Sequence, residues 1–210
     1  MLSFNQKRFL FWDFDGVIKD SVDVKTCAFV SLFKNFGSEV LNQVVEHHEA
    51  NGGVSRFEKM PLYLNWAGVK VNKSIIEKYL SSFSNLVVKD VIDSPWVPGV
   101  VEYLEKYKSN QMFFLVTATP KWEIELILKQ LSLYNCFYEI IGAPTKKIPA
   151  IKSIVREFNI TTMDAGMIGD SESDMEAAVQ NDIDFFLRKT LINKPLQSLY
   201  KGPQFENFIK

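Results

Sequence analysis

The stretch RFLFWDFDGVIKDS, residues 8–21, places two aspartates, Asp13 and Asp15, at the end of an almost wholly apolar run. A continuous apolar run of this kind is typical of a strand that is buried on both faces of a parallel sheet. Because residues i and i+2 of an extended segment point to the same side, both carboxylates are expected to face one small volume. The stretch therefore predicts a rigid strand that delivers two acids to one place.

Four further apolar runs have the length of strands, and helical patterns separate them. The predicted strands are residues 8–14, 111–117, 138–142, 165–169 and 184–188. Apolar residues at helical spacing predict helices over 100–107, 124–131 and 151–158, and the sequence SDME at 173–176 indicates a capping box for a fourth helix. This alternation favours an α/β fold, a Rossmann-like parallel sheet of about five strands with helices on both faces.

The segment from residue 20 to residue 95 interrupts the alternation, because it holds helical patterns and no convincing strand. Apolar faces recur there at 29–36, 40–45, 57–64 and 76–83. We therefore expect a core domain formed by residues 1–19 and 96–210, with a helical cap domain, residues 20–95, inserted between the first two strands. Ser21 is expected to cap the first helix of this insertion.

Composition and charge favour a globular protein that acts on small molecules. The 210 residues include 24 Lys and Arg against 25 Asp and Glu, so the net charge of −1 gives no reason to expect nucleic acid or a membrane as partner. Cys27 and Cys136 lack metal-binding spacing. Asp13 interrupts the N-terminal apolar stretch too early for a signal peptide. We expect a cytoplasmic protein, and the sequence carries no signal for a particular oligomeric state.

Side chains that can take part in catalysis follow four of the predicted strands, at the edge where ligands of open α/β sheets bind. They are Asp13 and Asp15 after the first strand, Thr117 at the end of the second, Lys146 and Lys147 in the third connection, and Asp170 with Asp174 after the fourth. One carboxylate of such a set can attack an electrophile such as phosphorus while another donates a proton to the leaving oxygen. Crowded carboxylates repel each other, and Asp170 would complete an oxygen site for Mg²⁺. The set predicts phosphoryl chemistry.

Four of these motifs, in this order, resemble the haloacid dehalogenase-like hydrolase superfamily. They are DFDGV after a strand, the Thr that ends FFLVT, a Lys before a helix, and GDSESD after another strand. The resemblance extends over essentially the whole chain and points to the branch of phosphoglycolate phosphatases and β-phosphoglucomutases, which has a helical cap.

The resemblance implies a role for each matching residue. Asp13 would be the nucleophile and Asp15 the general acid/base. Mg²⁺ would bind the side chains of Asp13 and Asp170 and the backbone carbonyl of Asp15, with Asp174 in support. Thr117 and Ala118 would bind the phosphoryl group of the substrate. The lysine would pair with the same group, and although Lys146 or Lys147 could serve, Lys147 is favoured because it is closer to the following helix.

A loop in the predicted cap carries a further resemblance. The sequence NGGVSRFEK, residues 51–59, includes GVSR, which is similar to the specificity loop of β-phosphoglucomutases. There the arginine meets a second phosphate of the substrate, so Arg56 is expected to bind substrate. His47 and His48 are adjacent on a predicted helix and are not expected to bind one metal.

The expected activity is a Mg²⁺-dependent phosphatase that hydrolyses a small phosphomonoester, of the phosphoglycolate or sugar phosphate type, through an aspartyl-phosphate. The GVSR loop favours a phosphomutase as the alternative, although Gly169 stands where mutases tend to have an acid. A dehalogenase would not need Asp15, because halide leaves without a proton. A catalytically silent binding protein with the same fold is the remaining alternative.

Overall fold

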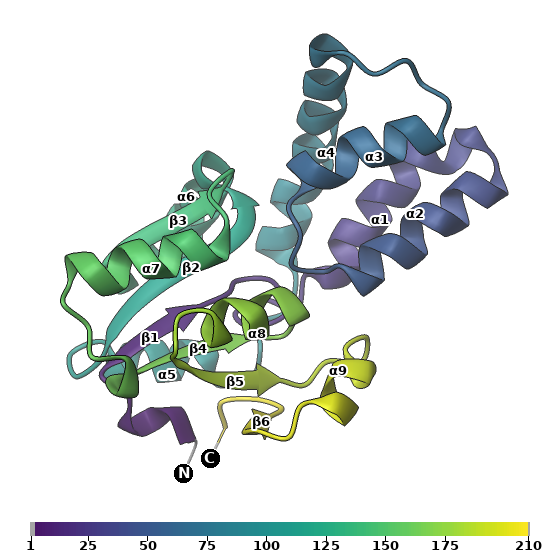
Figure 1. The fold of residues 1–210 in the computed structure, drawn as a ribbon. Coiled ribbons are helices and arrows are strands. Elements are labelled where there is room, and N and C mark those ends of the chain that lie inside the picture. The colour runs from purple at the N-terminus through teal and green to yellow at the C-terminus, as the bar shows by residue number, and fades with distance from the viewer. Residues whose placement is uncertain (1–2, 210) are drawn as a thin grey trace.

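The computed structural model describes residues 3–209, and a parallel sheet forms its centre (Figure 1). The strand order is β3-β2-β1-β4-β5-β6, and every pairing is parallel. The strands are β1 (Phe9–Trp12), β2 (Met112–Pro120), β3 (Glu139–Ala143), β4 (Ala165–Gly169), β5 (Asp184–Arg188) and β6 (Gln204–Phe205). The predicted α/β fold is confirmed. The strand missing from the prediction, β6, has two residues in the weakly patterned tail, too few for an alternation to be visible.

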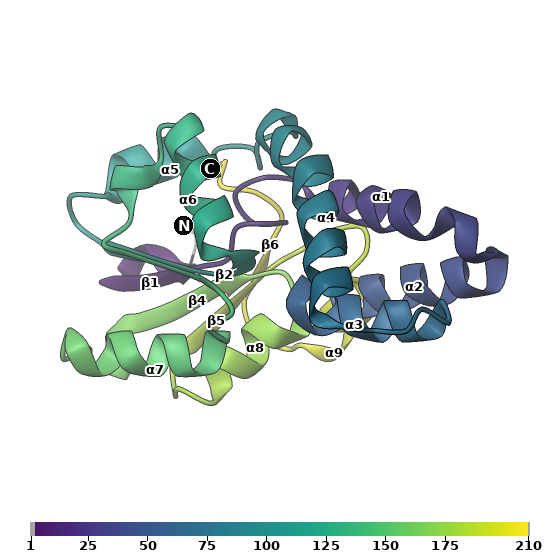
Figure 2. The ribbon, with the colours of Figure 1, turned by 90° about the horizontal axis from the view of Figure 1, so that it is seen from above.

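Both faces of β1 are buried, which explains its unbroken apolar sequence. Leu10 and Trp12 belong to the core on one face of the sheet, and Phe9 and Phe11 belong to the core on the other. Helices α5 (Val100–Tyr107) and α6 (Lys121–Gln130) cover the first face, and α7 (Lys147–Glu157) and α8 (Glu172–Val179) cover the second (Figure 2). The central strand therefore emerges from the core only at its ends.

Four helices between β1 and β2 pack beside the sheet (Figure 1). They are α1 (Val22–Phe33), α2 (Ser38–Ala50), α3 (Arg56–Trp66) and α4 (Lys73–Asp93). Phe29 forms the centre of their core, with ring centroids 5.1 Å from Tyr63 and 4.4 Å from Phe83. We refer to α1–α4 as the cap. The division into a core domain and a cap domain at residues 20 and 95 stays a prediction. The two chain segments that connect the cap to the sheet lie side by side, since the backbone N–H of Asp20 donates to the carbonyl oxygen of Pro95 over 2.9 Å.

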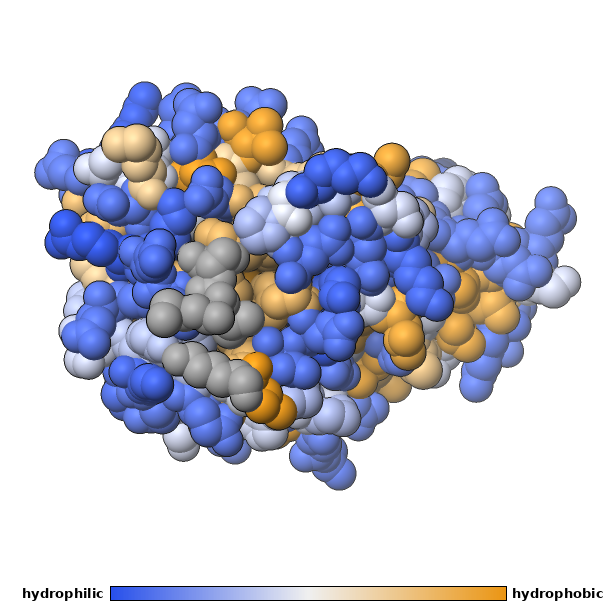
Figure 3. Space-filling view, turned by 90° about the horizontal axis from the view of Figure 1, so that it is seen from below, coloured by the Kyte–Doolittle hydropathy of each residue, from blue (hydrophilic) through white to orange (hydrophobic). Residues whose placement is uncertain are grey.

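The remaining elements are short. They are α9 (Lys194–Leu199) and the 3₁₀ turns Ser3–Gln6, Lys34–Phe36, Tyr134–Cys136 and Thr162–Asp164. Seen from below, the molecule is largely hydrophilic, with smaller apolar areas between the polar side chains (Figure 3). Within residues 3–209, every helix is too short or too polar to cross a membrane.

Candidate active site

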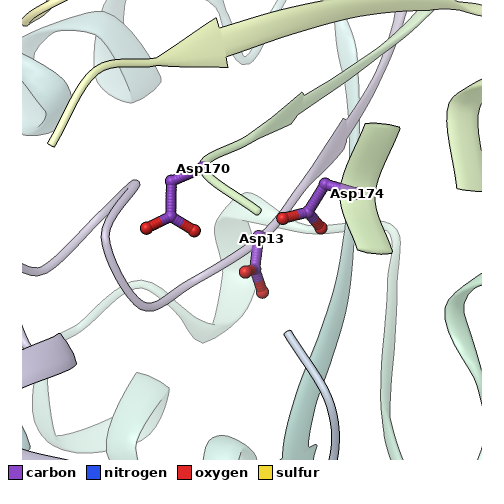
Figure 4. A group of neighbouring side chains, drawn as sticks. All are labelled: Asp13, Asp170 and Asp174. Atoms are coloured by element: carbon purple, nitrogen blue, oxygen red, sulfur yellow. The ribbon is translucent and has the colours of Figure 1, made fainter. Parts of the chain in front are cut away.

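Three buried aspartates meet at the carboxyl ends of the central strands (Figure 4). Asp13 follows β1, Asp170 follows β4, and Asp174 lies in the first turn of α8. Each offers a carboxylate oxygen, and these oxygens lie within 4.8 Å of one another. The structure thus brings together side chains that are far apart in the sequence, at the edge of the sheet where ligands of such folds bind.

Asp13 has one engaged and one free carboxylate oxygen. Its Oδ2 lies 3.0 Å from the Lys147 ammonium, whereas Oδ1 is buried without a hydrogen-bond partner among residues 3–209. Burial raises the pKa of Asp13 to about 6, against the opposing effect of Lys147 and with a further rise from Asp174 and Asp15. A buried polar atom without a partner is costly, so the free oxygen indicates a site built for something that binds there.

Asp170 lies next to the DFDG turn, and the turn explains its glycine. Gly16 has a φ of +74°, and a Cβ at this position would overlap the Asp170 carboxylate. Burial, and then the negative charges of Asp13 and Asp174, raise the pKa of Asp170 well above its ordinary value. Mutual repulsion of this kind is relieved by a hard cation, and carboxylate oxygens are the ligands that Mg²⁺ prefers. The donor set fits Mg²⁺.

Asp174 differs from the other two aspartates because both of its oxygens already have partners. Oδ1 accepts from Lys147 Nζ over 2.5 Å, and Oδ2 accepts from the backbone N–H of Ser171 over 3.1 Å and from the Ser171 hydroxyl over 2.5 Å. This capping box is formed by residues 171–174, so the prediction of a box at 173–176 was wrong by two positions. Its use of Asp174 fits a supporting role behind the other carboxylates.

The structure distinguishes Lys146 from Lys147, the two candidates for the lysine of the motif. Lys147, the first residue of α7, is buried and contacts both Asp13 and Asp174. Burial alone would lower the pKa of Lys147, but the two carboxylates outweigh burial and raise it above the ordinary value. Lys146 is exposed and pairs with Glu58 at 2.8 Å. Lys147 is therefore the lysine that lies at the candidate site.

Asp15 has its own set of partners. Its Oδ1 accepts from the Ser21 hydroxyl over 2.6 Å, and its Oδ2 contacts the Lys25 ammonium and the Thr119 hydroxyl, the latter at 3.2 Å. Burial by itself would raise the pKa of Asp15, but Lys25 and the hydrogen bonds from Ser21 and Thr119 lower it. In this arrangement, without substrate, the carboxylate form of Asp15 is favoured.

Ser21 occupies the N-cap position of α1, as predicted, but its hydroxyl has another role, and its neighbours Lys25 and Thr119 were not predicted. The Ser21 side chain makes no N-capping hydrogen bond to α1, since its hydroxyl is used on Asp15. Lys25 follows Ser21 by four residues on one helix face, and Thr119 follows Thr117 by two on one side of β2. These spacings are the signals by which both residues could have been found.

A cavity of about 340 Å³ adjoins these groups. Asp13, Asp15, Thr117, Ala118 and Asp170 contribute to its lining, as do the 51–54 loop of the cap and four residues near α9, namely Ile192, Asn193, Pro195 and Leu196. Thr117 Oγ accepts from the backbone N–H of Thr119 over 3.2 Å, which fixes the hydroxyl in the wall. Gly53 of the cap packs so closely on Ser171 and Ser173 that a Cβ would overlap their hydroxyls. The cap loop therefore lies directly on the core.

Arg56 is not part of this cavity lining. Its guanidinium donates to the two carboxylate oxygens of Glu123 on α6, over 2.9 and 2.6 Å, and to the Ser84 hydroxyl over 3.1 Å. It also lies 4.3 Å from the centroid of the Phe83 ring. The side chains of Arg56 and Glu123 are only 4% and 1% exposed, so the guanidinium is used for a buried contact within the protein. In this arrangement Arg56 joins the cap to the core, and its interpretation as a substrate ligand stays a prediction.

The sequence of residues 10–187 matches the family model of the haloacid dehalogenase-like hydrolases. The chain belongs to the haloacid dehalogenase-like hydrolase family. The matched range includes both aspartates of the DFDG turn, the cap, Lys147 and the Asp170–Asp174 segment. The predicted family is confirmed. Comparison with curated protein sequences gives no match.

Solved structures share the family fold over nearly the whole length. A protein from Haemophilus somnus, described as a predicted phosphoglycolate phosphatase, is 19% identical with a TM-score of 0.75, covering 97% of this chain and 96% of its own. CbbY from Rhodobacter sphaeroides, as a mutant in complex with xylulose-(1,5)bisphosphate, is 14% identical with a TM-score of 0.76, covering 96% and 95%. At such identities the likeness establishes the fold, including the cap helices, and not the substrate.

Proposed function

We propose that this chain is a Mg²⁺-dependent phosphatase that hydrolyses a small phosphomonoester through an aspartyl-phosphate on Asp13. The observation that carries the proposal is the state of Asp13: a buried carboxylate in the wall of a cavity, with Lys147 at 3.0 Å from one oxygen and no partner on the other among residues 3–209. A nucleophile needs a fixed position and a free oxygen, and Asp13 has both.

The reaction proceeds in two steps. First, an Asp13 oxygen bonds to phosphorus, the bond to the leaving group breaks, and the leaving oxygen takes a proton from the protonated carboxyl group of Asp15. Water then attacks phosphorus, the bond to Asp13 breaks, and Asp15 takes a proton from that water. The sum is ester and water giving alcohol and phosphate. The lowered pKa of Asp15 favours the carboxylate that the second step needs, so Asp15 must take up a proton as the substrate binds, before the first step.

The other residues position and neutralise charge. The side chains of Asp13 and Asp170 and the backbone carbonyl of Asp15 would hold Mg²⁺, with Asp174 behind them. When bound, Mg²⁺ supplies positive charge that stabilises the phosphoryl oxygens. Lys147 and the Thr117 hydroxyl bind the same oxygens, and Ala118 completes the wall beside Thr117.

The substrate is a small ester in our proposal, of the phosphoglycolate or sugar phosphate type, because the cavity measures about 340 Å³. The phosphomutase alternative loses the support of Arg56, whose guanidinium is committed to Glu123. We place the enzyme in the cytoplasm, which accords with the free thiols of Cys27 and Cys136.

The test is phosphate release from a panel of small phosphate esters, with Mg²⁺ and with a chelator. We expect Mg²⁺-dependent release that falls on the order of 10⁴-fold in Asp13→Asn. Asp184→Asn is the matched control, because Asp184 is 60% exposed and begins β5 rather than following a strand. Release that survives in Asp13→Asn would refute Asp13 as nucleophile, and no release from any ester would refute the phosphatase.

A further inference from the structure

The cap contains a lysine that is buried without a counter-ion. Lys59 on α3 is 2% exposed, and within residues 3–209 it forms no ion pair. Its ammonium contacts His48, with Nδ1 at 2.9 Å and the backbone oxygen at 3.5 Å. Buried lysines are almost always paired with an acid, because an isolated charge is costly to desolvate. The burial of Lys59 without an acidic partner in the described chain therefore calls for a physical explanation.

His48 extends this feature to the cavity. The ring is 3% exposed, lines the cavity with Asp13 and Asp15, and packs against Phe29 with centroids 4.8 Å apart. Because Lys59 donates to Nδ1, the ring proton resides on Nε2, which is a buried atom without a hydrogen-bond partner in the described chain. Burial, and then the charges of Lys59 and Lys25, lower the pKa of His48 to about 2, so the ring is neutral.

One neighbouring charge of the cap is positive as well, and Glu49 is the acid that the cap contributes to the same cavity lining. Lys25 lines the same cavity, and its ammonium already serves Asp15 and Thr119. The cap wall thus presents an unused N–H donor, a buried ammonium behind it and a second ammonium beside it. An apolar wall of the same shape would need none of these groups, and a wall built for a neutral substrate would gain nothing from them.

We propose that His48 and Lys59 form a subsite for a second anionic group of the substrate, a carboxylate or a phosphate at the end opposite the scissile phosphate. This inference rests on the proposed phosphatase function and names the class of its substrate. His48 Nε2 donates to the anion directly, and Lys59 supplies the countercharge through the ring. The subsite takes the part that sequence analysis gave to Arg56, whose guanidinium is bound to Glu123.

The experiment uses three esters that differ only at the far end: 2-phosphoglycolate, 1,2-ethanediol bisphosphate and 2-hydroxyethyl phosphate. We expect kcat/KM to be at least about 10-fold higher for one of the two anionic esters than for the neutral one. Lys59→Met and His48→Phe, which keeps a ring against Phe29, should each reduce that ratio about 10-fold. Lys78→Met, which removes an exposed lysine of the cap, is the matched control and should leave the ratio unchanged.

Binding gives a readout that does not depend on turnover. In Asp13→Asn, the anionic ester should raise the unfolding temperature more than 2-hydroxyethyl phosphate does, and adding Lys59→Met should remove the excess. Equal shifts for all three esters, or a kcat/KM ratio that Lys59→Met leaves intact, would overturn the subsite while the phosphatase stands. If no ester is hydrolysed, the proposed function fails, and the temperature shifts still decide the subsite.

Discussion

Two buried lysines, Lys147 in the core and Lys59 in the cap, occupy opposite electrostatic surroundings. Lys147 contacts two carboxylates, those of Asp13 and Asp174, and its pKa is raised. Lys59 contacts a neutral imidazole, and burial, followed by the charge of Lys25, lowers its pKa to about 7. The same residue type therefore stabilises one region and destabilises the other.

The two surroundings show which kind of charge each region lacks. At the sheet edge, positive charge is already present and negative charge is in excess, which suits a cation. In the cap wall, the ammonium groups of Lys25 and Lys59 outnumber the carboxylate of Glu49, which suits an anion. A substrate with a phosphoryl group at one end and an acid at the other would complement both regions together with Mg²⁺.

The largest effect should follow removal of the paired lysine. Lys147→Met leaves Asp13 and Asp174 buried without their common partner, so we expect the free energy of unfolding in chelator to fall by about 3 kcal/mol. Activity should fall by roughly 10² to 10³, because one charge facing the phosphoryl group is lost. Chemical denaturation and phosphate release measure the two effects. Lys152→Met, an exposed position on α7, is the control, and an equal loss there would contradict the assignment.

The next effect tests how the cap is joined to the core. Arg56→Met leaves Glu123 buried and unpaired, so the free energy of unfolding should fall by about 3 kcal/mol. The double change Arg56→Met with Glu123→Leu should recover most of that loss, because no unpaired charge remains. Denaturation of the two single variants and the double variant gives the coupling energy.

Lys146 and Glu58 provide the matched pair for that cycle. They also join the core to the cap, but their side chains are 68% and 49% exposed. Solvent screening should keep their coupling energy below about 1 kcal/mol. Equal coupling energies in the two pairs would contradict the view that burial decides the strength of this contact.

The sequence predicted the sheet and its acids well because both depend on local signals. Asp13 and Asp170 directly follow apolar runs, and strands of a parallel sheet end at the same edge whatever their order. The cap helices were equally visible as apolar faces. Strand β6, with two residues, gave no pattern to read.

Roles decided by tertiary contact could not be predicted in this way. Arg56 carries the same sequence signal whether it faces a substrate or Glu123, which is 67 residues away in the chain. Ser21 stands at the start of a helix, and only the fold shows that its hydroxyl serves Asp15 instead. Lys59 looks like an ordinary surface lysine until its burial is known.

An effect of opposite sign, a gain of stability, should follow removal of the unpaired lysine. Lys59→Met replaces a buried ammonium by an apolar chain of similar length, so the free energy of unfolding at pH 6 should rise by about 2 kcal/mol. The gain should depend on pH. The pKa of Lys59 falls from 10.5 to about 7 on folding, so the unfolded chain holds the extra proton between these values. The stability of the wild type therefore rises with pH across that window, relative to the variant.

The measurement is the difference in unfolding free energy between wild type and Lys59→Met from pH 6 to pH 9.5. It should be largest near pH 6 and shrink steadily above pH 7, whereas the difference for Lys78→Met, at an exposed position, should stay near zero. A Lys59→Met variant that is less stable than the wild type at every pH would show that Lys59 has a counter-ion within the protein, and the anion subsite would lose its physical basis. A gain that 2-phosphoglycolate or 1,2-ethanediol bisphosphate abolishes, by stabilising the wild type alone, would instead join the stability argument to the binding argument, because the ligand would then supply the missing charge.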